Sequence, residues 1–184
     1  MSGAHDDEAP SVHRHHREAP SALGIAVVTV SDTRTLETDT GGALLVELAE
    51  AEGHRLILRE IAADDPEAIR AAVGRAVAHA EVQAVILTGG TGVAPRDVTP
   101  ETVEPLFERA LPGFGELFRM LSFEEIGAAA LLSRAPAGSI DGRVVFALPG
   151  SRGALRTAMS RLILPELGHL VGESRKGARG HGGS

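Results

Sequence analysis

The chain has 184 residues, a formal charge of −7 at pH 7 and no Cys, Trp or Tyr. Without Cys it can form no disulfide, use no thiolate nucleophile and build no Cys-ligated zinc or iron–sulfur site. Its single Lys, Lys176, follows the last apolar segment, which excludes a P-loop lysine or a Schiff-base lysine within the fold. A bound nucleotide would therefore depend on backbone amides, Arg side chains or a metal ion.

The composition also argues against two classes of partner. The acidic balance disfavours binding to duplex nucleic acid, and Phe is the only aromatic residue on which a base could stack. No stretch approaches the roughly 18 apolar residues of a membrane-spanning helix, and the polar start is not a signal peptide. We expect a cytoplasmic protein with neither a nucleic-acid nor a membrane partner.

One domain between two polar tails accounts for the length. Residues 1–21 are expected to be a disordered, His-rich tail, although His13, His15 and His16 could also bind a metal. Residues 173–184 are expected to be a flexible C-terminal tail. The tails hold equal numbers of acidic and basic residues, so the charge of −7 belongs to the domain at 22–172.

In the first half of the domain, strand and helix patterns alternate. The apolar run at 23–30 predicts a buried strand, and the helical spacing of leucines over 41–53 predicts a helix. A second strand is predicted over 55–61, followed by a helix that begins at the Asp-Asp-Pro-Glu segment 64–67. A third strand is predicted over 82–87.

The second half repeats the alternation after a glycine-rich loop. A helix is predicted to begin at Thr99, with Thr99 as its cap and a division at Pro105. Helical stretches follow over 115–134, then a strand over 144–148 and a long final helix interrupted at Pro165. This order predicts an α/β fold with three layers (α/β/α) and a mostly parallel sheet. Ligands of such sheets bind beyond the carboxyl ends of the strands.

A glycine-rich loop follows the third strand. Gly89, Gly90 and Gly92 let the backbone approach a ligand closely, and Thr91 adds a hydroxyl. A phosphate-binding loop and a plain tight turn are both compatible with this pentapeptide. The Gly-x-Gly-x-x-Gly spacing of a dinucleotide-binding oxidoreductase is absent.

Two carboxylates follow strands at the same edge. Asp97 lies just beyond the glycine loop, where a carboxylate would repel a phosphate unless a divalent cation lay between them. Asp64 and Asp65 end the second strand, and because one Asp suffices to cap the next helix, the other is free for a ligand or metal. Mg²⁺ bound by one or two carboxylates and phosphate oxygens suits this pattern. A surface ion pair of Arg96 and a helix cap are the structural alternatives.

Two further loops complete the set. Ser31 and Thr33 follow the first strand, and Pro149, Gly150 and Ser151 connect the last strand to a helix whose N-terminus could receive an anion. A simple helix cap at Ser151 explains that segment equally well. A Ser-His-Asp triad is not supported, because the His residues of the domain fall on helices or their ends.

Several segments together resemble the MoaB/MogA family of molybdenum cofactor biosynthesis proteins, and FRMLSFEEIG points to its MoaB branch. The resemblance covers about residues 22–172. It is carried by TVSDTR at 29–34, TGGTG at 88–92, RDVTPE at 96–101, PGFGELFRMLSFEEIGAAALLSR at 112–134 and ALPGSRGALRTAM at 147–159.

The resemblance implies a function for these loops. It implies a homo-oligomer (a trimer or a hexamer), binding of molybdopterin, contacts to other cofactor-biosynthesis proteins, and Mg-ATP-dependent adenylylation of molybdopterin with release of pyrophosphate. Matched by motif, Asp64 and Asp97 are the expected functional carboxylates and the expected metal ligands. The matched substrate- and nucleotide-binding residues are Ser31, Thr33, Gly89, Gly90, Thr91, Gly92, Pro149, Gly150 and Ser151.

One departure bears on activity. Family members often have a Val-Pro or Ile-Pro pair before the Asp that ends the second strand, whereas this chain has Ala62-Ala63. The Asp is kept, so the departure concerns geometry rather than charge. A non-catalytic molybdopterin-binding or partner-binding member of the same family is the alternative to an adenylyltransferase.

Overall fold

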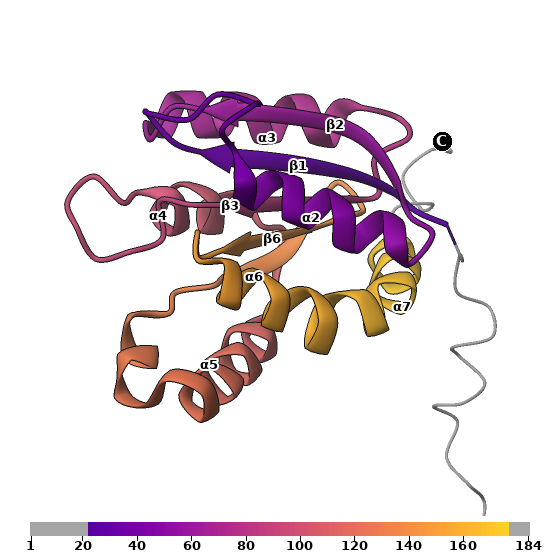
Figure 1. The fold of residues 1–184 in the computed structure, drawn as a ribbon. Helices are drawn as coiled ribbons and strands as arrows, with labels where there is room; N and C mark the ends of the chain where they lie inside the picture. The colour runs from indigo at the N-terminus through magenta and orange to yellow at the C-terminus, as the bar shows by residue number, and fades with distance from the viewer. Residues whose placement is uncertain (1–21, 177–184) are drawn as a thin grey trace, which may run out of the picture.

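A six-stranded sheet forms the centre of the computed structural model, which describes residues 22–176 (Figure 1). The strand order is β2-β1-β3-β6-β5-β4. The pairs β2–β1, β1–β3 and β3–β6 are parallel, whereas β6–β5 and β5–β4 are antiparallel. The strands are β1 (Gly24–Val30), β2 (Arg55–Ala62), β3 (Ala84–Thr88), β4 (Arg109–Ala110), β5 (Ala137–Ile140) and β6 (Arg143–Leu148). The predicted mostly parallel sheet is confirmed.

Helices cover both faces of this sheet. On one face α2, α5, α6 and α7 enclose a core that includes Phe118 and Leu155, and on the other α3 and α4 contribute Ile69 and Val103. The helices are α2 (Thr40–Ala51), α3 (Pro66–Ala78), α4 (Thr99–Val103), α5 (Pro112–Ile126), α6 (Arg152–Ala158) and α7 (Leu164–Arg175). The three-layer prediction is confirmed. Across residues 22–176, no helix is both long enough and apolar enough to cross a bilayer.

Local sequence signals place the ends of the helices. The side chain of Asp65 accepts hydrogen bonds of 3.0 Å from two backbone N–H groups in the first turn of α3. Gly53 adopts a φ of +83° just after α2, a conformation that glycine enters without strain. Pro105 lies in the 3-10 turn η1 (Glu104–Leu106) that follows α4. Because Asp65 caps α3, its neighbour Asp64 remains available for another role.

The predicted cap at Thr99 is wrong. Val98 occupies the cap position of α4 without a side-chain hydrogen bond, and Thr99 is the first helical residue. The Thr99 hydroxyl instead donates to the carbonyl of Gly89 at 2.9 Å, and its backbone N–H donates to the carbonyl of Gly90 at 2.9 Å. Thr99 therefore fastens the glycine loop to the start of α4.

Other boundaries also differ from the prediction. The strands β4 and β5 were not expected, and the helix α7 runs to Arg175, beyond the predicted domain end at 172. The final helix is interrupted as predicted, by a π-helical segment at Met159–Ile163 directly before α7, which has Pro165 in its first turn. The predicted tail at 1–21, with its His residues, and residues 177–184 lie outside the described residues. The 3-10 segment η2 (Gly127–Leu132) follows α5.

Candidate functional site

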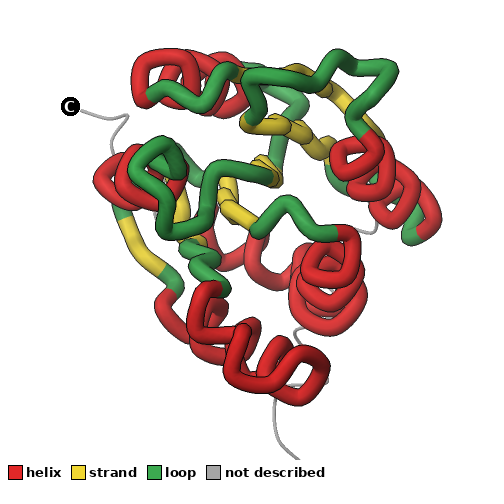
Figure 2. The backbone as a smooth tube through the Cα atoms, turned by 60° about the vertical axis from the view of Figure 1, so that its left-hand side comes forward, coloured by secondary structure: helices red, strands yellow, loops and turns green. Residues whose placement is uncertain are grey.

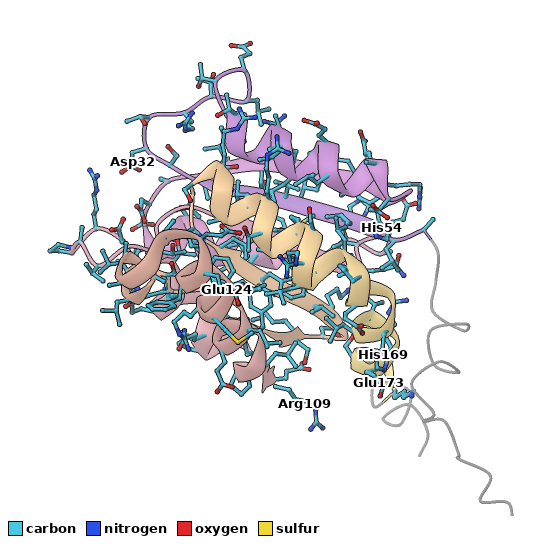
Figure 3. All side chains as sticks on the ribbon, turned by 60° about the horizontal axis from the view of Figure 1, so that its bottom comes forward. Asp32, His54, Arg109, Glu124, His169 and Glu173 are labelled. Carbon is cyan, nitrogen blue, oxygen red and sulfur yellow. The ribbon has the colours of Figure 1, made fainter. Side chains whose placement is uncertain are left out.

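The predicted site loops meet at one edge of the sheet. The parallel strands β1, β2, β3 and β6 all end there, so the loops that follow them are neighbours. Figure 2 turns this edge toward the viewer and shows the connecting loops gathered in front of the strands. Asp32 marks this edge in Figure 3, and His54 lies toward the opposite end of the molecule.

A pocket of about 160 Å³ lies between the ends of β1, β3 and β6. Three of the predicted site residues line it: Ser31, Gly89 and Gly150. Asp39, Thr40 and Gly41 at the start of α2 close another side of the pocket. The remaining lining residues are Thr29, Val30, Arg34 and Thr88. The pocket thus joins three loops that are far apart in the sequence.

The glycine loop approaches its neighbours too closely for side chains. Gly90 has a φ of +62°, and a β-carbon there would lie 2.4 Å from Oγ1 of Thr99 and 2.8 Å from Oδ1 of Asp64. At Gly92 a β-carbon would lie 2.5 Å from Oδ2 of Asp97. At Gly90 the positive φ disfavours any other residue, and at Gly92 a side chain would displace the Asp97 carboxylate. The same geometry brings the carboxylates of Asp64 and Asp97 against one loop.

Asp64 stands out among the carboxylates at this edge. Its side chain is half-buried, and Oδ1 is fully buried without a hydrogen-bond partner among residues 22–176. Its backbone N–H donates to Oδ1 of Asp32 at 2.9 Å, which ties the end of β2 to the loop after β1. A buried carboxylate oxygen without a donor is costly unless a cation or proton meets it.

Electrostatics at Asp64 favour the uncharged form. Burial raises the pKa of Asp64, and the negative charges of Asp97 and Asp32 raise it further, against the opposing backbone amide of Val98 and the charge of Arg96. A raised folded-state pKa contributes stability below the unfolded pKa that is lost as the pH rises through the folded pKa. At neutral pH the ionised carboxylate therefore destabilises the metal-free protein.

This imbalance predicts the effect of Asp64→Asn on stability. Without metal, the substitution is expected to raise the free energy of unfolding at pH 7.5 by about 0.5–2 kcal/mol, since it removes an unsatisfied charge. Thermal unfolding with a chelator measures the gain, and the gain should shrink toward pH 4. A lower melting temperature for Asp64→Asn at pH 7.5 would contradict this account of the site.

The donor set suits Mg²⁺ better than a metal held wholly by protein. Within the described part of the chain, no group of three or more His, Cys, Asp or Glu side chains is arranged to hold a metal ion. Mg²⁺ is commonly held by one or two carboxylates, with substrate phosphates and water supplying the remaining ligands. The unpartnered oxygen of Asp64 and the adjacent charge of Asp97 fit such a site.

The start of α2 is fixed by a buried ion pair. Asp39 is 2% exposed, and its carboxylate accepts from the Thr29 hydroxyl at 2.8 Å, the Gly42 amide at 2.9 Å and Nη2 of Arg59 at 3.1 Å. Arg59 also donates to the backbone carbonyl of Asp39 at 2.8 Å. Asp39 caps α2 and lines the pocket, so this network sets the position of one pocket wall.

Other predicted site residues have structural partners. Oγ of Ser31 accepts from the backbone N–H groups of Thr33 and Arg34, each at 3.3 Å, and shapes the loop after β1. Oγ of Ser151 accepts from the Ala154 amide at 3.3 Å, as expected of a cap for α6. The carbonyl of Pro149 accepts from the hydroxyl of Thr88, and Thr91 is buried. Roles of these residues in binding substrate stay predictions.

Sequence reasoning missed three contributors to this edge. Asp39 and Arg34 line the pocket, and Arg134 contacts the glycine loop from the far side. The Asp-Thr-Gly-Gly run at 39–42 carries a cap signal that could have identified Asp39. Arg134 has no local signal, because its partners lie 33 to 43 residues away in the sequence.

Comparison with known proteins agrees with this architecture. Residues 26–169 match the family described as a probable molybdopterin binding domain. Molybdenum cofactor biosynthesis protein B of Bacillus subtilis (strain 168) is 50% identical over 167 residues, covering 90% of this chain and 98% of the relative.

Solved structures give the same result. A crystal structure of a molybdenum cofactor biosynthesis protein B matches with a TM-score of 0.83 at 50% identity, covering 86% of this chain and 99% of that chain. The tungsten cofactor synthesizing protein MoaB from Pyrococcus furiosus matches with a TM-score of 0.78 at 36% identity, covering 86% and 100%. With the family match spanning most of its length, the chain belongs to the MoaB/MogA family of molybdenum cofactor biosynthesis proteins.

Proposed function

We propose that this protein acts in molybdenum cofactor biosynthesis as a Mg-ATP-dependent molybdopterin adenylyltransferase. Family membership and the names of its relatives support the biosynthetic role and molybdopterin as the substrate. The observation that carries the adenylylation step is the pair Asp64 and Asp97, both set against the glycine loop, with an unpartnered oxygen on Asp64.

The reaction requires correct positioning of its two substrates and does not require an activated side chain as nucleophile or base. An oxygen of the terminal phosphate of molybdopterin attacks the α-phosphorus of ATP, the new P–O bond forms, and the bond to the β-phosphate breaks with release of pyrophosphate. The attacking phosphate is already an anion, so no general base or covalent enzyme intermediate is required. In-line placement and charge neutralisation provide most of the catalysis in such transfers.

The residues at the sheet edge can divide this work. Gly89 and Gly90 let phosphate oxygens approach the backbone, and Arg34 with the start of α2 offers positive charge beside the pocket. Asp64 and Asp97 would hold Mg²⁺, which would neutralise phosphate charge during transfer. Because the reaction consumes ATP, the proposal includes a cytoplasmic location.

A turnover assay tests the proposal. Purified protein is incubated with molybdopterin, ATP and Mg²⁺, and released pyrophosphate is measured against a control without molybdopterin. We expect pyrophosphate to form only when both substrates and Mg²⁺ are present. Molybdopterin binding without pyrophosphate release would replace the proposal with the non-catalytic alternative.

We also propose that the protein forms a homo-oligomer through α5 and η2. On α5, Leu117, Met120, Phe123 and Ile126 repeat every three residues and are 48–62% exposed, and on η2 Leu131 is 84% exposed. An apolar stripe of this kind on one helix is typical of a protein interface. The family resemblance favours a second copy, in a trimer or hexamer, as the occupant.

A charge within the stripe is expected to break the oligomer. Phe123→Glu should shift the mass measured by size-exclusion chromatography with light scattering from that of an oligomer to that of the 19.1 kDa chain. Leu36→Glu, at a leucine of similar exposure in the loop between β1 and α2, is the control and should leave the mass unchanged. A monomeric wild-type protein would refute the proposed interface.

A further inference from the structure

Arg134 reaches the glycine loop from a distant part of the chain. It lies between η2 and β5, and its Nε donates to the carbonyl of Thr91 at 3.0 Å. Its Nη2 donates to the carbonyls of Gly92 at 2.5 Å and Asp97 at 3.2 Å. Its Nη1 contacts Glu101 in α4. One guanidinium thus contacts both ends of the segment between the glycines and the functional Asp97.

That segment has few other ties to the fold. Two hydrogen bonds between Ala94 and Asp97 close the segment on itself. The amide of Ala94 donates to Oδ2 of Asp97 at 3.1 Å, and the amide of Asp97 donates to the carbonyl of Ala94 at 2.9 Å. Gly89 and Gly90 are anchored by Thr99, but Gly92 and the backbone of Asp97 are anchored by Arg134.

The chemistry of arginine suits this role. A guanidinium presents its N–H donors in a rigid planar fork, whereas the flexible ammonium of Lys acts as a point charge. The carboxylate of Glu101 holds the fork in place, and its hydrogen bond with Arg134 lowers the pKa of Glu101. The Arg134 side chain is 31% exposed, so water competes only partly for its donors.

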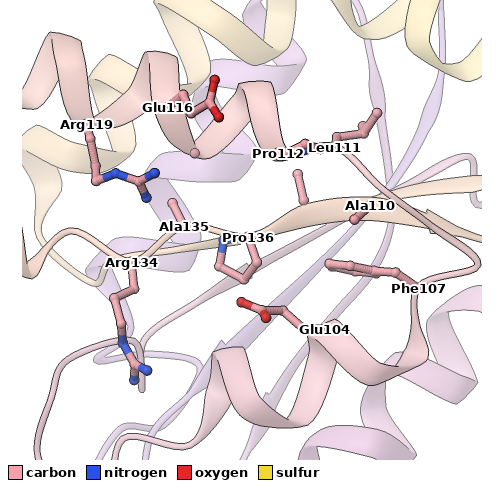
Figure 4. A pocket seen from close by; sticks show the side chains of 12 residues that line it. Glu104, Phe107, Ala110, Leu111, Pro112, Glu116, Arg119, Arg134, Ala135 and Pro136 are labelled. Atoms are coloured by element: carbon pink, nitrogen blue, oxygen red, sulfur yellow. The ribbon is translucent and has the colours of Figure 1, made fainter.

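Arg134 stands outside the pocket of about 160 Å³. It lines instead a second pocket of about 470 Å³ between α5 and the strands β4 and β5, which Arg119 and Glu116 line from α5 (Figure 4). A change at Arg134 therefore acts on the candidate site through the loop and not by direct contact within the smaller pocket.

We propose that Arg134 is a positioning residue that holds Gly92 and Asp97 in register, so that the Asp97 carboxylate would be placed, together with Asp64, to hold a divalent cation. The inference rests on the proposed adenylylation for its kinetic consequence, but not for its structural one. Removing the Arg134 guanidinium should make residues 91–98 more mobile, weaken Mg²⁺ binding in the presence of ATP, and leave the core of the fold unchanged.

The test compares Arg134→Gln and Arg134→Lys with a matched control. Arg143→Gln is that control, because Arg143 also bonds a backbone carbonyl and a carboxylate, both of Asp141, but at the turn before β6 and far from the site edge. For Arg134→Gln we expect the apparent dissociation constant of Mg²⁺, measured in the presence of ATP, to rise by about 10–100-fold, with a smaller change in the KM for molybdopterin. The Mg²⁺ constant of Arg134→Lys should lie between those of wild type and Arg134→Gln, and that of Arg143→Gln should equal the wild-type value.

Hydrogen–deuterium exchange separates this inference from the proposed function. Amides of residues 91–98 should exchange faster in Arg134→Gln than in wild type, while those of β1 and β3 should not change. Unchanged exchange over 91–98 would overturn the inference, as would a uniform loss of protection across the sheet. If wild type shows no turnover, adenylylation fails, and the exchange result still decides whether Arg134 positions the loop.

Discussion

Replacing Asp97 by Asn is expected to lower the turnover of molybdopterin adenylylation by about 10²–10³-fold while the protein remains folded. Asn has nearly the same shape and can still accept the hydrogen bond from the Ala94 amide, so the loop should keep its course. It lacks the negative charge needed to hold Mg²⁺ beside phosphate. Pyrophosphate release under saturating substrates measures the loss, and circular dichroism checks the fold.

A neighbouring carboxylate provides the matched control. Asp65 lies at the same sheet edge as Asp64, but its side chain is occupied by the first-turn amides of α3. Asn is also a good cap, so Asp65→Asn should keep both the fold and the turnover of wild type. Turnover of Asp97→Asn equal to that of wild type, or equal losses in Asp97→Asn and Asp65→Asn, would contradict the assigned role of Asp97.

The largest effect on stability is expected from Asp39→Ala, at about 3–5 kcal/mol of lost unfolding free energy. The substitution removes the cap of α2 and leaves the hydroxyl of Thr29 without its acceptor. It also leaves the positive charge of Arg59, whose side chain is 22% exposed, without its carboxylate partner. Urea denaturation monitored by circular dichroism measures the change. A loss below about 1 kcal/mol, the range of exposed ion pairs, would show that this network contributes little.

The stability that the Asp39 network contributes is expected to depend on pH in the acid range. Burial by itself would raise the pKa of Asp39, but hydrogen bonds from Gly42, Thr29 and Arg59, with the charge of Arg59, outweigh burial and lower the pKa below 3.8. A depressed folded-state pKa contributes stability above the unfolded pKa that is lost as the pH falls through the folded pKa. The stability difference between wild type and Asp39→Asn should therefore be constant near pH 7 and shrink below about pH 3.8.

The parts of the fold that could be predicted from sequence are those with a local signal. The strands β1, β3 and β6 are nearly continuous apolar runs, as expected of strands covered by helices on both faces. The strand β5 has no such run, and its Gly138 is required because a β-carbon there would lie 2.4 Å from the Phe107 ring. Its partner β4 has only two residues, Arg109 and Ala110, so no periodicity could reveal it.

The same distinction applies to the site. The glycine loop and Asp97 could be predicted because strand-end loops of a parallel sheet meet at one edge and these residues lie within such a loop. The choice of Asp64 over Asp65 rested on the family resemblance. Arg134 could not be found in this way, since its function depends on contacts between separate loops that only the folded chain creates. The hydroxyl of Thr99 was assigned to the wrong task for the same reason: the competing partner, the carbonyl of Gly89, is ten residues away.

The central claim is that this edge of the sheet joins AMP to the terminal phosphate of molybdopterin. A single-turnover experiment with protein in excess over molybdopterin tests it most directly, with the pterin product identified by mass spectrometry after addition of ATP and Mg²⁺. The account predicts one AMP added per molybdopterin, with one pyrophosphate released, and no such product from Asp97→Asn. Folded wild-type protein that binds molybdopterin yet leaves it unmodified would contradict the account.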